Sequence, residues 1–143
     1  YVTTDYDSPT ERHFPDPALQ CDMQHMPIRD DSFDCALCVH VLEHVMDDRK
    51  GIGEIRRVLK PGGVAYLMVP FMMGWEKTVE FGKPDPLAFD HFRGYSVNDF
   101  GERLAGFEYQ AIYPGVFLSA QELFRYGIPP DSQVIYRCVK PRL

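Results

Sequence analysis

The stretch CDMQHMPIRDDSFDCALCVHVLEHVMDDRKGIGEIRRVLKPGGVAYLMVP, residues 21–70, decides the fold of this 143-residue chain. Residues 33–39 are apolar on both faces apart from Asp34, which is typical of a central strand in a parallel sheet. Residues 64–69 form a second apolar run, which Pro70 closes. A helical stretch separates the two runs. We therefore predict a β-strand, α-helix, β-strand unit with a right-handed crossover, and an α/β fold class.

The helix between these strands has its own start and stop signals. Asp47 or Asp48 can cap its N-terminus, and the Lys-Pro-Gly-Gly turn at residues 60–63 ends it. Apolar residues at positions i, i+3 and i+7 form its buried stripe: Ile52, Ile55 and Leu59. Gly51 and Gly53 are poor helix formers, so either the first turn is loose or another segment packs closely against it.

The segment before this unit predicts two short strands. Residues 1–5 are β-branched and aromatic and end in Asp5, which favours a strand with a carboxylate at its C-terminal edge. Open parallel sheets bind ligands at that edge, although a surface aspartate in a turn is the alternative. Residues 19–22 form the second short strand, with Asp22 and Met23 at its exit.

The segment after Pro70 begins with a long connection. Residues 76–88 contain Gly82, Pro84 and Pro86 and predict a loop, so we expect residues 71–95 to act as a lid or substrate loop. Ser96 then caps a predicted helix at residues 96–104. Three further elements are predicted: a strand at residues 108–113, a short helix at residues 118–126 and a last strand at residues 133–139. The two strands are expected to form an antiparallel edge.

Composition limits the class of partner. The chain is 45% hydrophobic and 25% charged, as expected for a single domain with a core, and its net charge is −6. A negative chain lacks the basic patch that nucleic acid or a membrane surface requires, so we expect neither partner. No apolar run approaches the roughly 18 residues of a spanning helix, and no signal peptide is visible, which favours a cytoplasmic protein.

The cysteines favour the same compartment. Cys21, Cys35, Cys38 and Cys138 stand among apolar neighbours without a repeating spacing, so we expect reduced core residues. Cys35 and Cys38 are three apart on a strand and point to opposite faces, so the pair cannot easily chelate a metal or form a disulfide.

Several motifs, in this order along the chain, resemble class I S-adenosylmethionine-dependent methyltransferases of the small-molecule type. They are Asp22 in its exit loop, Ser32-Phe33-Asp34, Val41-Leu42-Glu43-His44-Val45, Arg57-Val58-Leu59-Lys60-Pro61-Gly62-Gly63, Asp90-His91-Phe92-Arg93 and Gly106-Phe107. The resemblance covers residues 1–139. It implies a Rossmann-like sheet that is mostly parallel, with an antiparallel C-terminal edge.

The resemblance also implies roles for individual residues. Asp5 matches the acid that binds the ribose of S-adenosylmethionine, and Asp22 matches the acid that accepts from the adenine amino group. Met23 matches the residue that frames the adenine. His40 matches a position that lines the methionine end of this cofactor.

His44 and His91 are the candidate catalytic bases. Methyl transfer needs a base only when the acceptor must lose a proton, and imidazole suits that role near neutral pH. A helix-entry contact for His44 and a loop-anchoring contact for His91 are the structural alternatives. Glu43 and His44 could also suggest a metal ion, but two adjacent ligands are too few, and no metal site is expected.

One part of the family pattern is absent. No glycine-rich loop or preceding strand stands before Asp5, so we expect residues 1–143 to be one truncated domain whose sheet is incomplete at the N-terminus. A sheet that lacks its central strand invites pairing, which predicts a homodimer. Two functions stay open: methyl transfer to a small-molecule acceptor, with the activity of this chain alone in doubt, and a non-catalytic binding or assembly module.

Overall fold

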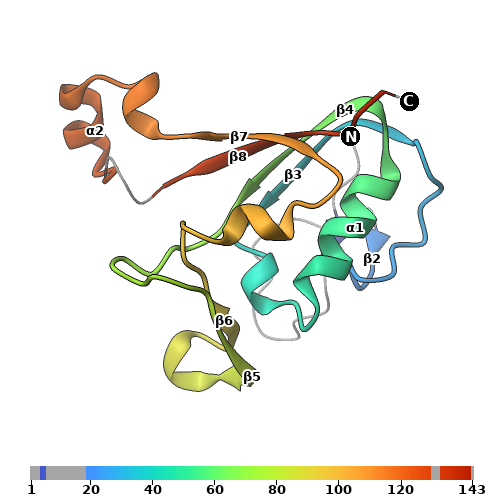
Figure 1. The fold of residues 1–143 in the computed structure, drawn as a ribbon, viewed down its shortest axis with the longest axis horizontal. Helices are drawn as coiled ribbons and strands as arrows, with labels where there is room; N and C mark the ends of the chain where they lie inside the picture. Colours follow the sequence, from blue (N-terminus) through green and yellow to red (C-terminus); the bar gives the residue numbers. More distant parts are fainter. Residues whose placement is uncertain (1–3, 6–18, 130–132, 143) are drawn as a thin grey trace.

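A computed structural model describes residues 4–5, 19–129 and 133–142 and shows a mixed α/β fold (Figure 1). β1 (Thr4–Asp5) pairs in parallel with β2 (Leu19–Gln20), and β3 (Phe33–Val39) pairs in parallel with β4 (Leu59–Met68). Beyond β4 the sheet becomes antiparallel through β8 (Ile135–Val139) and β7 (Glu108–Ile112), in the order β3-β4-β8-β7. The predicted α/β class and the antiparallel C-terminal edge are confirmed.

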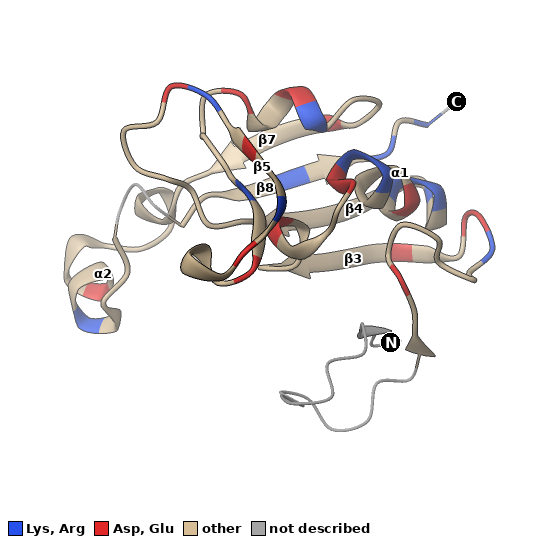
Figure 2. Cartoon of the chain, turned by 90° about the horizontal axis from the view of Figure 1, so that it is seen from below, with Lys and Arg blue, Asp and Glu red and all other residues tan. Residues whose placement is uncertain are grey.

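The crossover helix α1 (Asp48–Val58) forms where it was predicted, but it ends at Val58, and Leu59 together with the predicted turn at residues 60–63 belongs to β4. The side chain of Asp47 caps it by accepting a hydrogen bond from the N–H of Lys50 at 3.0 Å. The three residues of the predicted stripe are all buried: Ile52, Ile55 and Leu59. Acidic and basic residues lie side by side along the helix (Figure 2), and the half-buried Arg57 donates to the half-buried Glu54 at 2.6 Å.

Gly51 is explained by the close approach of Met23. A Cβ at Gly51 would lie 3.3 Å from Cγ and Cε of the Met23 side chain, so Met23 occupies the space that another residue would need. Of the two alternatives for the first turn of α1, close packing is therefore confirmed. Gly53 has no such neighbour, since a Cβ there would meet nothing within 4 Å.

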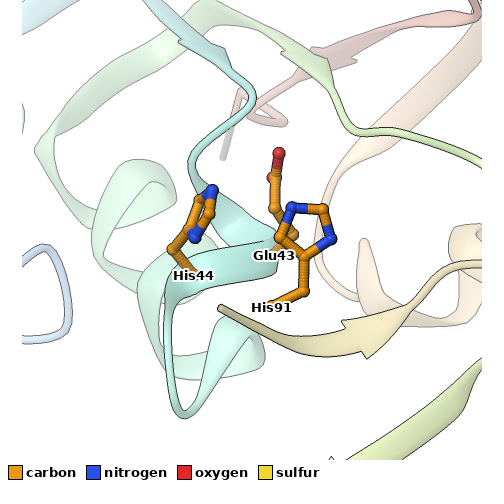
Figure 3. A group of neighbouring side chains, drawn as sticks. All are labelled: Glu43, His44 and His91. Carbon is orange, nitrogen blue, oxygen red and sulfur yellow. The ribbon is translucent and has the colours of Figure 1, made fainter. Parts of the chain in front are cut away.

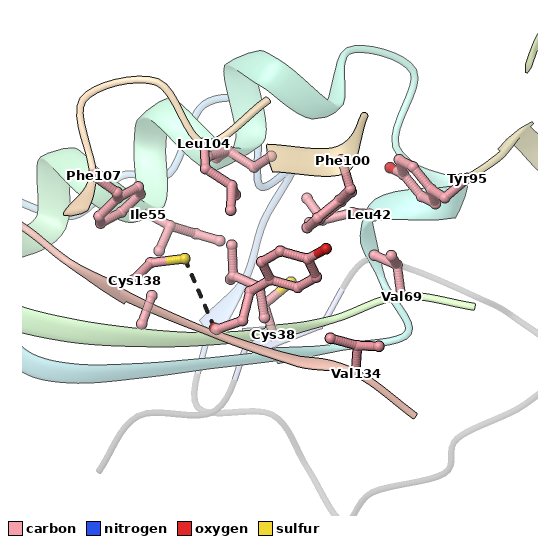
Figure 4. Close-up of a cluster of buried hydrophobic side chains, with 14 of the residues drawn as sticks. Cys38, Leu42, Ile55, Val69, Tyr95, Phe100, Leu104, Phe107, Val134 and Cys138 are labelled. Atoms are coloured by element: carbon pink, nitrogen blue, oxygen red, sulfur yellow. Dashed lines mark hydrogen bonds between the residues drawn. The ribbon is translucent and has the colours of Figure 1, made fainter. Parts of the chain in front are cut away.

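The core lies between α1 and one face of the four-stranded sheet (Figure 4). Its fully buried side chains come from the sheet, from the η1 turn and from residues 95–104: Leu42, Leu59, Leu67, Val69, Tyr95, Phe100, Leu104, Val134 and Cys138. Each such aliphatic or aromatic side chain contributes about 1.5–3 kcal/mol through its removal from water. This packing fixes the carboxyl ends of β3 and β4 relative to α1.

The prediction of β3 as a central, fully covered strand is wrong for the part of the chain that the structure describes. There β4 is the one sheet neighbour of β3, and Leu37 is 75% exposed. The apolar pattern of β3 matches a strand with neighbours on both sides, but only its inner face, which includes Cys38, is buried.

Residues 79–94 form a β-hairpin where a loop was predicted. β5 (Val79–Asp85) pairs antiparallel with β6 (His91–Gly94), and the short η2 turn (Pro86–Ala88) connects them. Gly82 and the prolines do not prevent pairing, because the register shifts between Glu80 and Asp85. A role of residues 71–95 as a lid stays a prediction.

The predicted helix at residues 96–104 is wrong. Only the short turn η3 (Phe100–Arg103) is helical there. Ser96 Oγ donates instead to the carbonyl of Trp75 at 2.7 Å, and Asp99 accepts from both N–H and Oγ1 of Thr78 at 2.8 and 2.6 Å. Both side chains thus hold the segment that leads into the hairpin.

The C-terminal elements follow the prediction closely. After the η4 turn (Pro114–Val116), α2 (Ala120–Tyr126) begins with a capping box between Ser119 and Glu122. No helix in the described ranges is both long and apolar enough to cross a membrane.

The cysteines are unpaired, as expected, but not all of them belong to the core. Cys38 and Cys138 are buried, Cys21 is half-buried and Cys35 is exposed. The core placement predicted for Cys35 is therefore wrong. The opposite orientation of Cys35 and Cys38 on β3 is confirmed.

Candidate functional site

The first group of candidate residues lies at the carboxyl ends of β1 and β2. The two strands are parallel, and Asp5 pairs with Gln20, so Asp5 and the exit loop at Asp22 follow the same edge. For Asp5 only the backbone belongs to the described part of the chain, and the placement of its side chain lies outside it. Parallel strands offer their carboxyl edge to ligands, which agrees with the position predicted for both acids.

Asp22 is a half-exposed carboxylate held by its own loop. Its Oδ1 accepts from the main-chain N–H of Gln24 at 2.8 Å and from the Gln24 side-chain amide at 3.1 Å. The hydrogen bond from the Gln24 N–H, helped by the nearby His25, lowers the pKa of Asp22 below its ordinary value. Asp22 is therefore ionised at neutral pH. An ionised carboxylate has about four acceptor positions, so some remain for an N–H donor of a ligand.

Met23 connects this loop to α1 and to the core. Its side chain packs against Gly51 in the first turn of α1 and against the buried cluster. The side chain of Gln24 strengthens the connection, since its Oε1 accepts from the N–H of Asp47 at 3.1 Å. The loop that carries Asp22 is thus fixed to the N-terminus of α1.

The second group of candidate residues surrounds η1 (Leu42–His44), just beyond the carboxyl end of β3 (Figure 3). His40 continues the parallel ladder, because its N–H donates to Met68 O at 2.9 Å, and it has a positive φ of 52°. Its Nδ1 lies 3.4 Å from Glu43 Oε1. The rings of His44 and His91 stand nearly perpendicular, with centroids 4.7 Å apart. The structure therefore brings three predicted residues together around Glu43, which was not among the predicted site residues.

Glu43 is the unusual member of this group. Its side chain is 1% exposed, and its Oε2 has no hydrogen-bond partner in the described part of the protein. Burial raises the pKa of Glu43, while the neighbouring His44 and His40 act in the opposite direction. Buried polar atoms are nearly always paired, so an unpaired carboxylate oxygen in a cluster of imidazoles points to a binding role.

His91 is half-buried at the start of β6, and its environment favours the neutral imidazole. Burial lowers the pKa of His91 below its ordinary value, and the nearby His44 and His40 lower it further. The two residues before it, Phe89 and Asp90, both have positive φ values, of 56° and 59°. Non-glycine residues in this region are strained, and such strain concentrates at functional sites.

Arg93 holds the two segments of the second group together. Its side chain is 3% exposed, although the group is charged. It donates to three main-chain carbonyl oxygens at 2.6–3.0 Å, those of Leu42, Val45 and Met46. Because Arg93 is two residues beyond His91, this contact fixes the hairpin against η1.

A buried charge network continues from Arg93 to α1. Asp48 accepts from Arg103 Nη1 at 2.7 Å and from Tyr95 Oη at 2.8 Å. Glu80 joins the two arginines by accepting from Arg93 at 2.7 Å and from Arg103 at 2.6 Å. Sequence reasoning missed this network. The available signal was Arg93 itself, a charged residue inside a short stretch with Phe92 and Tyr95.

An apolar hollow of about 340 Å³ lies beside the carboxyl end of β4. Its walls include apolar side chains from β4, from the η4–α2 region and from β8: Met68, Phe117, Leu118, Ile128 and Ile135. Its volume falls in the roughly 300–1,000 Å³ range of small-molecule sites. The main-chain hydrogen bond between His40 and Met68 places the hollow and the second group at neighbouring strand ends.

Comparisons with known proteins relate this chain to methyltransferases. A family described as a methyltransferase domain matches residues 4–67, which run from β1 to the end of β4. A probable S-adenosylmethionine-dependent methyltransferase of Mycolicibacterium smegmatis is 32% identical over 93% of this chain. The chain spans about half of that relative, 54% of its length. A ubiquinone/menaquinone biosynthesis C-methyltransferase of Haemophilus ducreyi is 33% identical over 56% of this chain and 27% of its own length.

Solved structures agree at the level of the fold. The crystal structure of an S-adenosylmethionine-dependent methyltransferase from Mesorhizobium loti matches 89% of this chain and 71% of its own chain, with a TM-score of 0.60 and 18% identity. The match covers the Rossmann-like sheet described above. Residues 4–67 thus match the methyltransferase-domain family, and the relatives and the fold together support a class I S-adenosylmethionine-dependent methyltransferase.

Proposed function

We propose that the protein transfers a methyl group from S-adenosylmethionine to a small-molecule acceptor. The observation that carries the proposal is the extent of the methyltransferase-domain match, which includes β1, β2 and β3 and therefore Asp5, Asp22 and His40 at or just beyond their carboxyl ends. Because the chain spans 54% of the M. smegmatis relative, the proposal concerns the protein as the cell produces it, to which these residues contribute.

The residues of the first group suit the cofactor. Asp22 is ionised and half-exposed, so it can accept from the adenine amino group, and the apolar side chain of Met23 can lie against the adenine ring. Asp5 would accept from the ribose hydroxyls, and His40 would line the methionine end. When bound, S-adenosylmethionine supplies a methyl group on a sulfonium, and the electron pair of the broken carbon–sulfur bond stays on sulfur.

The second group suits the acceptor. A lone pair of the acceptor forms the new bond to the methyl carbon, and the proton that the acceptor loses passes to a ring nitrogen of His44 or His91. The lowered pKa of His91 keeps its imidazole neutral near pH 7, which is the form that accepts a proton. Positioning and the exclusion of water supply most of the rate in such a displacement.

The surroundings of the second group favour an acceptor with an apolar part. The hollow beside Met68 is lined by apolar side chains. The hairpin at residues 79–94 would cover the acceptor, and its tip carries Leu87 and Phe89, which are 96% and 83% exposed. The H. ducreyi relative is named for ubiquinone/menaquinone biosynthesis, which is consistent with apolar acceptors in this family.

Calorimetric titration with S-adenosylhomocysteine tests the proposal. It is made on the protein as the cell produces it, on the 143-residue chain, and on two variants of the former. Asp22→Ala removes a hydrogen bond to a charged group, worth about 1.5–3 kcal/mol, so we expect about 10- to 150-fold weaker binding. Asp34→Ala is the matched control, because Asp34 is an 85% exposed carboxylate at the opposite end of β3.

Each result of this titration has a clear meaning. Binding by both forms supports the proposal, as does binding by the cell-made protein alone, which would place part of the cofactor site outside these residues. Absence of binding by both forms would refute methyl transfer. Equal binding by the Asp22→Ala and Asp34→Ala variants would refute the role given to Asp22.

A non-catalytic assembly module is the second candidate function. The exposed face of β3 favours it, because Leu37 and Val39 are 75% and 47% exposed on a strand with one described neighbour. An open apolar edge is a template for pairing, including pairing of two copies. Sedimentation of the wild type and of a Leu37→Lys variant tests it. A dimer that the substitution dissociates, together with absence of cofactor binding, supports the module; a monomeric wild type refutes it.

A further inference from the structure

Three side chains that the sequence separates meet at one point beyond β3. Glu43 and His44 come from η1, and His91 comes from the start of β6 (Figure 3). One ligand atom of each residue lies within 4.8 Å of the ligand atoms of the other two. Two adjacent residues were too few to predict a metal from the sequence, but the hairpin adds the third.

The buried carboxylate is an independent sign that something binds here. Glu43 is 99% covered, and its Oε2 has no hydrogen-bond partner among the described residues. A buried carboxylate oxygen without a partner is expensive, whether the group is charged or carries a proton that needs an acceptor. A cation at this point would satisfy the oxygen directly.

The geometry points to a divalent metal site, and we propose that Glu43, His44 and His91 bind one transition-metal ion of the zinc class. Two imidazole nitrogens and one carboxylate oxygen suit zinc and similar borderline ions, whereas calcium and magnesium prefer oxygen ligands alone. Three protein ligands leave at least one coordination position open. That position would accept a water molecule or an oxygen atom of a bound small molecule.

The distances require only local movement of side chains. A four-coordinate zinc ion about 2.0–2.2 Å from each ligand holds its ligand atoms about 3.4 Å apart. The present separations of up to 4.8 Å therefore have to shrink by about 1.4 Å at most. His44 is exposed and free to turn, while Glu43 is held in the interior.

The backbone that carries the ligands is already fixed. Arg93 donates to three carbonyl oxygens around η1, and its own position in β6 is two residues from His91. The two ligand-bearing segments are therefore joined by a buried guanidinium rather than by the metal. Such support is what a preorganised metal site requires.

The metal proposal can be tested independently of the proposed methyl transfer, although a bound ion would change the role of the two imidazoles. With the ion bound, His44 and His91 are ligands and no longer proton acceptors. A zinc titration uses no S-adenosylmethionine or acceptor, so failure of zinc binding leaves the cofactor titration untouched. The reverse also holds.

Zinc binding to the tag-free, chelator-treated protein tests the inference, measured by competition with a chromophoric chelator. We expect one zinc ion per chain, and at least about tenfold weaker binding in Glu43→Gln and His91→Ala. His25→Ala is the matched control, because His25 is 68% exposed and bonded to Asp22 and Lys50 instead. It should bind zinc like the wild type.

The contrary results are equally definite. Absence of zinc binding by the wild type, or equal binding by all three variants, would overturn the inference. If a variant fails to fold, the visible spectrum of the wild type with Co²⁺ decides. Intense bands of a four- or five-coordinate site support the inference, and the spectrum of the hydrated ion overturns it.

Discussion

Replacement of Arg93 by alanine is the most informative test of how the site is held. In the wild type the Arg93 guanidinium is 3% exposed and donates to three carbonyl oxygens around η1. It also donates to Glu80 at 2.7 Å and lies 3.7 Å from Asp48. Arg93→Ala removes all of these contacts and leaves the backbone of η1 without its donor.

The loss in free energy of unfolding depends on which partners of Arg93 lose a contact. Breaking a buried ion pair by removing one partner costs about 3–5 kcal/mol, because the other charge stays buried. Asp48 still accepts from Arg103 and Tyr95, and Glu80 is 50% exposed, so neither carboxylate is left without compensation. We therefore expect the lower end, about 3 kcal/mol.

Urea unfolding followed by far-UV circular dichroism measures this loss. At a typical slope of about 2 kcal/mol per molar urea, the midpoint falls by about 1.5 M. Arg125→Ala is the control, since Arg125 is exposed on α2, and its free energy of unfolding should stay within about 0.5 kcal/mol of the wild type. If Arg93→Ala does not fold, Tyr95→Phe removes only the bond to Asp48 and should cost about 1–3 kcal/mol. Variants as stable as Arg125→Ala would refute the reasoning.

The other predictions concern pH and two glycines. Hydrogen bonding from Arg57, which outweighs burial, lowers the pKa of Glu54. The stability from this carboxylate is therefore present above the ordinary pKa of about 4.3 and is lost as pH falls through the lowered pKa. Urea midpoints measured from neutral pH to pH 3 should fall more steeply for the wild type than for Glu54→Gln, and parallel curves would contradict this. Gly94→Ala places a Cβ 2.7 Å from the Trp75 ring and should cost about 1–3 kcal/mol with a change in tryptophan fluorescence, whereas an unchanged spectrum and midpoint would be a contrary result. Gly53→Ala meets nothing within 4 Å and should raise the free energy of unfolding by up to about 1 kcal/mol. A lower free energy of unfolding would show that the first turns of α1 are constrained in another way.

The sequence predicted the elements whose causes are local. The cap at Asp47 and the stripe of α1 act within a few residues of one another, and both appear in the structure, although β4 already begins at Leu59 and takes up the predicted Lys-Pro-Gly-Gly turn. The α2 helix follows for the same reason, because Ser119 and Glu122 form its capping box within one turn.

The failures come from contacts between distant segments. Ser96 and Asp99 have the spacing of a helix start. In the structure, however, the Ser96 side chain donates to the carbonyl of Trp75, and the Asp99 side chain accepts from Thr78. No local pattern could reveal that Arg93 reaches carbonyl groups 47–51 positions earlier in the chain.

The candidate site was predicted in part. His40, His44 and His91 were chosen from their positions after strands or in a predicted lid, and the structure brings them together. Glu43 was passed over as a site residue because its burial, which makes it unusual, depends on the packing around η1.

Methyl-labelled methionine NMR with S-adenosylhomocysteine tests the central claim most directly. The chain has 6 methionines, and Met23 is the one that the proposed cofactor site includes. The titration should use the protein as the cell produces it, with Asp22→Ala as the control. We predict that the Met23 methyl signal shifts in a saturable way and that Asp22→Ala weakens this shift. Saturating ligand that leaves the Met23 signal unmoved would contradict the account.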